Sequence, residues 1–128
     1  MKTLLILMTV LFLIECSSDQ KQLDIPELAW DVDEVIIPDS VSSFEIPVKI
    51  KYSASGCHIF KRLEIKEIES GILSVKFFIY NPSYHRNDVA CTMAIYKNET
   101  SQVIKAPAKG NYTLLFNQDK LIKKIKVK

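Results

Sequence analysis

The sequence is poor in the residues that phosphate-binding loops and metal centres need. Its 128 residues include three glycines, two histidines (His58 and His85) and two arginines (Arg62 and Arg86). A phosphate-binding loop needs closely spaced glycines, and a histidine-based metal site needs several imidazoles. Arginine forks, which dominate phosphate recognition, are also scarce. We therefore expect no cofactor and no bound metal.

Catalytic side chains are equally scarce. Ser83, His85 and Asp88 form the one grouping that could supply a nucleophile, a base and an orienting acid. Such groups normally converge from separate segments of a chain, whereas these three are close neighbours in one segment. We interpret them as parts of a solvated loop, and the protein is predicted not to be an enzyme.

A short apolar segment opens the chain. Lys2 is the only charge before Glu15, and the residues from Thr3 to Ile14 are apolar or nearly so. A helix needs roughly 20 apolar residues to span a bilayer, and this run is shorter. A positive start and a short apolar run are typical of a secretory signal peptide, which we predict over residues 1–15. No later run is long and apolar enough to span a membrane.

The end of this segment, Leu13-Ile14-Glu15-Cys16, resembles the lipobox of bacterial lipoproteins, in which leucine stands three residues before a modified cysteine. The resemblance implies that Cys16 is acylated and becomes the mature amino terminus. It also implies anchoring to a membrane of the cell envelope, at the periplasmic face or the cell surface. Several acyl chains give stable anchoring, whereas one chain is marginal. The alternative is ordinary cleavage after Ser18, which would release a soluble secreted protein.

Two cysteines remain once Cys16 is set aside. Cys57 and Cys91 form an even pair, and exported proteins keep their disulfides. We predict a disulfide between them, the alternative being two buried free thiols. No Cys-x-x-Cys pattern occurs, which argues against a redox enzyme.

Period-two alternation of apolar and polar residues dominates the rest of the chain. It predicts half-buried strands, and the clearest are at 44–52, 73–79, 112–116 and 121–127. Pro47 within the first of these indicates an edge or a bulge. A strand is also expected over 58–68, with Ile59, Leu63 and Ile65 on one face. After Cys91 the pattern predicts strand residues at Met93 and Ile95 and again at 103–104, with a bulge or turn over 98–102.

These elements define the predicted fold. Residues 16–31 are polar and are expected to be a tether, and residues 32–128 a single domain. No helical pattern of ten or more residues appears there. Seven to nine short strands with regular turn signals predict an all-β sandwich or barrel.

Two features favour a sandwich. Gly110 followed by Tyr112 resembles the tyrosine corner of immunoglobulin domains, in which the hydroxyl bonds to upstream backbone. The order Cys57, Cys91, Tyr112 resembles small exported bacterial β-sandwich domains. The resemblance implies an immunoglobulin-like antiparallel β-sandwich, a fold that many functions share.

The distribution of charge and the residues of one loop indicate what kind of partner the protein could bind. Residues 46–128 carry a net charge of +9 and residues 17–45 one of −7. A basic ladder near the carboxyl terminus could bind an anionic glycan, or its lysines could protect a sheet edge from aggregation. An exported protein rarely meets nucleic acid, so no nucleic acid partner is expected. In the loop 81–90, Tyr84, His85 and Arg86 are the best partner-binding candidates because tyrosine and arginine are enriched at binding hot spots. We expect Trp30 to pack the first strand onto the sandwich.

The sequence thus predicts a non-enzymatic binding or structural module at the bacterial cell envelope, with a membrane anchor and a protein or glycan partner. The alternative is a small inhibitor or immunity-type protein that blocks a partner enzyme or toxin through one rigid loop. The oligomeric state stays open.

Overall fold

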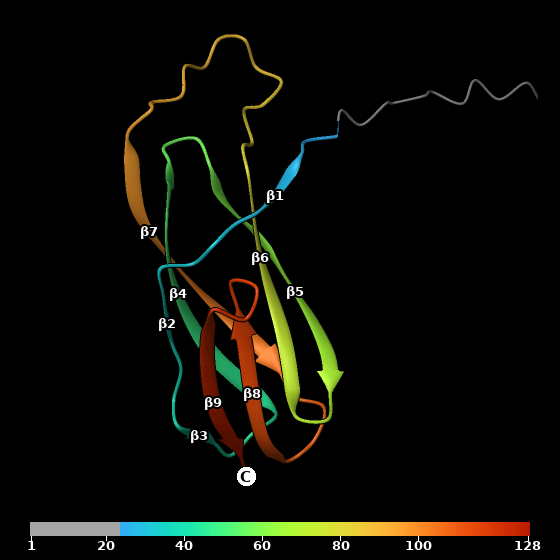
Figure 1. The fold of residues 1–128 in the computed structure, drawn as a ribbon. Helices are drawn as coiled ribbons and strands as arrows, with labels where there is room; N and C mark the ends of the chain where they lie inside the picture. The colour runs from blue at the N-terminus through green and yellow to red at the C-terminus, as the bar shows by residue number, and fades with distance from the viewer. Residues whose placement is uncertain (1–23) are drawn as a thin grey trace, which may run out of the picture.

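The computed structural model describes residues 24–128, so the predicted signal peptide and Cys16 lie outside the described residues. The described chain is all-β and folds as two sheets in a sandwich-like arrangement that is not closed (Figure 1). Its strands are β1 (Glu27–Ala29), β2 (Glu34–Ile36), β3 (Ser40–Val41), β4 (Glu45–Ser55), β5 (Ile59–Glu69), β6 (Ile72–Tyr80), β7 (Ile95–Lys105), β8 (Gly110–Phe116) and β9 (Leu121–Val127).

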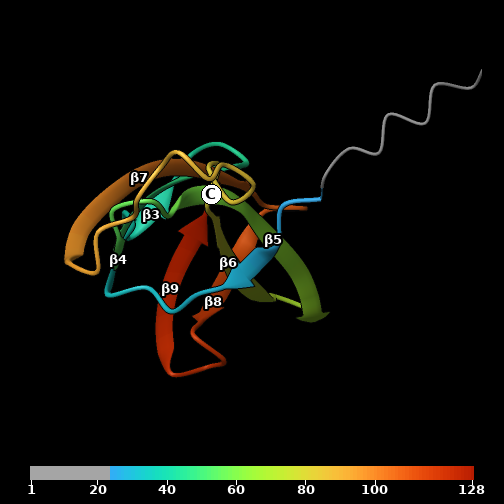
Figure 2. The same cartoon turned by 90° about the horizontal axis from the view of Figure 1, so that it is seen from above.

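The two sheets differ in size. The larger has the order β1-β6-β8-β9-β3, with β5 on the other edge of β6, and the smaller has the order β2-β4-β7. β8 and β1 share one edge of β6, because β8 pairs with its residues 72–74 and β1 with its residues 78–80. Seen from above, β4 and β7 lie on one side of the molecule and β8 and β9 on the other (Figure 2).

The larger sheet is mixed, which corrects the prediction of an antiparallel sandwich. Two of its strand pairs are parallel, namely β6 with β8 and β3 with β9. Parallel neighbours need a crossover connection, and here the chain leaves β6, forms β7 in the smaller sheet and returns as β8. The count of nine strands agrees with the predicted seven to nine.

The core lies between the sheets and follows the predicted alternation. Along β4 every second side chain from Ile46 to Ala54 is buried, and along β6 every second one from Leu73 to Ile79. Within residues 24–128 no polar or charged residue is buried. The buried side chains are Val32, Val35, Ile46, Val48, Ile50, Tyr52, Ala54, Leu73, Val75, Phe77, Ile79, Ile104, Ala106, Tyr112, Leu114, Phe116, Ile125 and Val127.

Pro47 lies within the long central strand of the smaller sheet. The amide of Ala106 donates to the Phe44 carbonyl at 2.7 Å, so even-numbered residues of β4 direct their backbone groups toward β7. Odd-numbered residues, Pro47 among them, therefore face the β2 side. β2 pairs only with Lys49–Lys51, so β4 is locally an edge at Pro47 and its missing N–H breaks no bond between the strands.

β5 departs from the predicted face. The register with β6 shifts between Phe60 and Arg62, which is a β-bulge. One extra residue reverses which side chains point inward. Leu63 packs against the core as predicted. Ile59 instead lies on the opposite face and is 45% exposed, and Phe60 packs against the core in its place.

The segment after Cys91 also departs from the prediction. β7 runs without interruption from Ile95 to Lys105 and pairs residue by residue with β4, so residues 98–102 form neither bulge nor turn. Polar side chains are tolerated there because β7 is the last strand of its sheet, and Asn98, Thr100 and Gln102 are only half-buried. Met93 precedes the strand and is 94% exposed.

The domain begins earlier than the predicted tether boundary at residue 31. β1 pairs with the end of β6, and Trp30 donates its backbone N–H to Phe77 O (2.8 Å) and its ring N–H to Ser53 O (2.8 Å). Trp30 thus joins the two sheets, as expected of a residue that packs the first strand onto the sandwich. Residues 27–30, which lie in the predicted tether, thus gain backbone partners from the end of β6 that β8 leaves unpaired.

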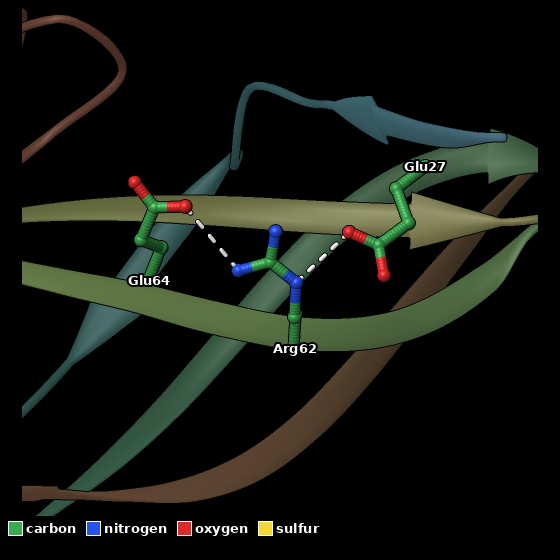
Figure 3. Close-up of polar contacts among 3 residues, drawn as sticks. All are labelled: Glu27, Arg62 and Glu64. Carbon is green, nitrogen blue, oxygen red and sulfur yellow. Dashed lines mark hydrogen bonds and ion pairs between the residues drawn. The ribbon is translucent and has the colours of Figure 1, made fainter.

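Arg62 of β5 holds β1 in place through an ion pair with Glu27 (Figure 3). Its Nε donates to Glu27 Oε2 at 2.8 Å, its Nη1 donates to Glu64 Oε2 at 3.3 Å, and its guanidinium lies 4.2 Å from the centre of the Phe78 ring. The Glu27 carboxylate raises the pKa of Arg62. These contacts cross β6 from β5 to β1 on the outer face of the larger sheet.

Tyr112 makes the hydrogen bond expected of a tyrosine corner. Its hydroxyl donates to Ala108 O at 2.8 Å and accepts from Ala108 N at 3.1 Å. The ring is buried, so the hydroxyl holds the turn that precedes β8 against the core.

Candidate functional site

The predicted disulfide is formed. Cys57 and Cys91 are bonded, with their Cα atoms 5.4 Å apart. Cys57 lies in the turn between β4 and β5, and Cys91 lies in the long connection between β6 and β7. The bond therefore ties this connection, residues 81–94, to the turn between β4 and β5. We call residues 81–94 the β6–β7 loop.

Local hydrogen bonds shape the first half of the β6–β7 loop. Asn81 starts it as an Asx turn, because its side-chain oxygen accepts from Ser83 N at 2.9 Å and its carbonyl accepts from Tyr84 N at 3.1 Å. Arg86 N donates to Ser83 O at 2.9 Å. The Asn81 amide also contacts Cys91 Sγ at 3.6 Å, which joins the two ends of the loop.

The three residues predicted to bind a partner lie together but serve different roles. Tyr84 is 56% exposed and its ring meets the His85 ring edge-on, with the centres 4.8 Å apart. His85 Nε2 lies 3.2 Å from Asp24 O, at the start of the described chain. Arg86 is paired with Asp88, so Tyr84 is the member of the three whose side chain makes no hydrogen bond within residues 24–128.

Arg86 and Asp88 form a bidentate pair on the loop surface. Nε donates to Oδ1 at 3.1 Å and Nη2 to Oδ2 at 2.8 Å. The Arg86 guanidinium lowers the pKa of Asp88, and the Asp88 carboxylate raises the pKa of Arg86. Both side chains are exposed, so we assign the pair little stability. The pair neutralises the charge of this part of the loop. The exposed apolar side chains are therefore what the loop offers to a partner.

A hollow of about 600 Å³ lies beside the disulfide. This hollow was not predictable from the sequence, because its walls come from three separate segments of the chain. Tyr96 of β7 packs on Gly56, where an added Cβ would lie 3.2 Å from the ring, and His58 Nδ1 lies 2.5 Å from Ser55 Oγ in the same turn. Its lining is Ser55, Gly56, Cys57, His58, Ile59, Val89, Ala90, Thr92, Tyr96, Lys97 and Asn98.

Large apolar side chains are exposed at this end of the molecule. Met93 is 94% exposed, Tyr84 56% and Ile59 45%. Scattered exposed apolar residues are ordinary, but Tyr84 and Met93 belong to one loop, which the disulfide ties to the turn between β4 and β5. Methionine and tyrosine are frequent on protein-binding surfaces, since one adapts its shape and the other has a polar end.

A second hollow, of about 650 Å³, lies on the outer face of the smaller sheet. Four of its five charged side chains already have a partner, Glu99 being paired with Lys49. Lys51 Nζ lies 3.5 Å from Glu34, and Ser53 Oγ donates to Asp33 at 2.5 Å. A ligand would have to displace these partners, so the hollow beside the disulfide is the better candidate site.

The grouping Ser83, His85 and Asp88 is not assembled into a nucleophile–base–acid chain. His85 contacts Asp24 and Asp88 contacts Arg86. Among residues 24–128 no group of three or more His, Cys, Asp or Glu side chains is placed to hold a metal ion. The same residues include no helix long and apolar enough to cross a membrane.

Comparison of the chain with protein-family models, curated proteins and solved structures found no match. What is established is therefore a small all-β protein of two sheets with one disulfide.

Proposed function

We propose that this protein is a non-enzymatic binding module of the bacterial cell envelope, which recognises a protein through the β6–β7 loop and the hollow beside it. Export and a membrane anchor at Cys16 complete the proposal, and the sequence over residues 1–16 supports them. An immunoglobulin-like topology belongs to the same proposal, supported by the Tyr112 hydroxyl bond to Ala108.

One observation carries the proposal. The disulfide ties the β6–β7 loop to the turn between β4 and β5, and this tethered loop exposes Tyr84 and Met93. A tethered loop loses less conformational freedom on binding than a free one, so more of the contact energy remains as affinity. Loops held on a rigid scaffold are also a common recognition surface.

The loop surface can be tested by capture from exported cell fractions. The double variant Tyr84→Ala/Met93→Ala is expected to lose a partner that the wild type retains, because aromatic and apolar anchors dominate binding energy. Ile122→Ala is the matched control, since Ile122 is 54% exposed but lies on β9 in the larger sheet. Equal capture by wild type and double variant would contradict the proposal.

A second candidate is a small inhibitor or immunity-type protein, which needs a rigid projecting loop. Its support is the shape of the β6–β7 loop, which rises beyond the turn between β4 and β5 (Figure 1). An inhibitor would reduce the activity of the captured partner when added to it, whereas a structural module would not. The Tyr84→Ala/Met93→Ala variant separates specific inhibition from a general effect.

The anchor has its own test. Mass spectrometry of the mature amino terminus is expected to find Cys16 as the first residue, with acyl chains attached. Cys16→Ser should abolish the modification and release the protein from the membrane fraction. An unmodified peptide that begins at Asp19 would show ordinary cleavage after Ser18 and would disprove the anchor without affecting the proposed binding surface.

A further inference from the structure

The smaller sheet ends in a long regular strand. β7 pairs with β4 along all of its residues from Ile95 to Lys105, with no register shift, and in residues 24–128 no strand pairs with its other edge. β5 is also an edge strand, but it carries two bulges, which are a usual protection against strand addition. β7 has neither a bulge nor a proline. It is therefore the edge open to another strand.

The backbone groups at this edge can be assigned. The Ala106 N–H bonds to Phe44 O, so even-numbered residues of β7 direct their N–H and C=O groups toward β4. Odd-numbered residues direct theirs toward the open edge. Lys97, Glu99 and Ser101 thus present the free donors and acceptors. The first half of β7 lies at the outside of the molecule in both views (Figures 1 and 2).

Charges on the outer face of the sheet alternate toward this edge. Glu34 is in register with Lys51, and Lys51 with Glu99. Lys49 Nζ also lies 2.9 Å from Glu99, and this contact lowers the pKa of Glu99, which is therefore ionised at neutral pH. The row runs negative, positive, negative and stops at the open edge. The next strand should offer a positive side chain opposite Glu99.

We propose that two copies of this chain associate by antiparallel pairing of their β7 strands over residues 95–101, with Asn98 on the two-fold axis. This register sets Glu99 opposite Lys97 of the second copy and Lys97 opposite its Glu99. Opposite charges facing each other across strands are stabilising, and like charges are destabilising. The alternating row Glu34, Lys51, Glu99 then continues into the second copy with the positive charge of its Lys97. Isologous pairing of this kind closes as a dimer, because each copy uses the same 95–101 edge of β7 that the other copy needs.

Two other registers are less favourable. With Thr100 on the axis, neither Lys97 nor Glu99 meets an opposite charge. With Gln102 on the axis, Glu99 meets Lys105, but the paired segment then centres beside Ile104, which is fully buried under the other sheet. Around Asn98 the strand is exposed, with Ile95 at 66% and Tyr96 at 49%. The chosen register covers these apolar side chains in part.

Charge reversal tests the register. Lys97→Glu and Glu99→Lys each place two pairs of like charges across the axis, and each is expected to weaken the dimer by about tenfold or more. The double variant restores opposite charges and should restore the dimer. Lys105→Glu is the control, because Lys105 lies on the same strand and face but outside the paired segment. Sedimentation equilibrium of the purified full-length expression product provides the measurement.

A proline scan separates strand pairing from charge alone. Ser101→Pro removes an N–H that faces the open edge and leaves the bonds to β4 intact, so the variant should fold normally and be monomeric. Val103→Pro also removes an edge N–H, but beyond the paired segment, and should leave the dimer unchanged. Circular dichroism of each variant confirms that the sheets are retained.

Cross-linking in intact cells locates the axis. Asn98→Cys places two thiols opposite each other in a pair without backbone hydrogen bonds, about 4.5 Å apart at Cα, which a disulfide can bridge. A covalent dimer is expected on a non-reducing gel, and none for Thr100→Cys. A wild type that is monomeric throughout, charge reversals without effect, or cross-linking by Thr100→Cys instead of Asn98→Cys would overturn the proposal. So would a Ser101→Pro variant that folds and remains dimeric.

Discussion

Replacing Cys57 and Cys91 together by alanine is expected to lower the free energy of unfolding by about 3–4 kcal/mol. The bond closes a loop between residues 34 apart in sequence, and the cross-link removes conformations from the unfolded chain. Neither cysteine is buried, so lost packing should contribute little. Urea unfolding measures the change, because the midpoint falls while the slope reports any change in the unfolded state.

Reduction of the wild type provides the control. Under a reductant the wild type should unfold at the same urea concentration as the double variant, and the variant should not respond to the reductant. Two free thiols in the denatured, non-reduced wild type would contradict the bond itself. Because the bond also restrains the β6–β7 loop, the double variant should bind the proposed partner more weakly even where it is fully folded.

Phe116→Ala is expected to lower the free energy of unfolding by about 3–5 kcal/mol. The ring is 1% exposed at the end of β8, in the core between the two sheets. The next residue, Asn117, donates to Val32 O at 2.8 Å and accepts from Val32 N at 2.7 Å. A cavity at Phe116 should therefore also loosen the attachment of the chain before β2. Thermal and urea unfolding measure the loss.

The control for Phe116 lies on the neighbouring strand. Ile122 of β9 faces solvent, and Ile122→Ala should change the free energy of unfolding by no more than about 0.5 kcal/mol. A Phe116→Ala loss as small as the Ile122→Ala loss would mean that Phe116 does not occupy the core. Retained near-ultraviolet circular dichroism in both variants would show that the fold survives.

Much of the strand content was predictable because alternation is a local property. A strand turns successive side chains to opposite faces, so the alternation from Ile46 to Tyr52 and from Leu73 to Ile79 identifies the buried side without knowledge of the neighbouring strands. Phe44, predicted on the same buried face, precedes β4 and is 49% exposed. The disulfide followed from export and an even cysteine count. The hydrogen bond of the Tyr112 hydroxyl to upstream backbone was predicted from the resemblance of Gly110 and Tyr112 to a tyrosine corner.

The candidate site was predicted only in part. Tyr84 was identified from its residue type and from a loop rich in turn signals. Met93 was assigned to a strand because its spacing to Ile95 continued an alternation, although no strand forms there. Tyr96 and His58 were missed as walls of one hollow, since residues distant in sequence meet there only through the β4–β7 pairing and the disulfide.

The sequence by itself determined the all-β class, the inward faces of the long strands and the cysteine pair, because each depends on side-chain alternation or on residue type. Only the tertiary structure decided which strands are neighbours, including the parallel pairs of β6 with β8 and β3 with β9. It also decided that β1 joins the larger sheet and that β7 is an open edge. Which strands become neighbours depends on packing between segments that are distant in sequence, and a local residue pattern does not contain that information.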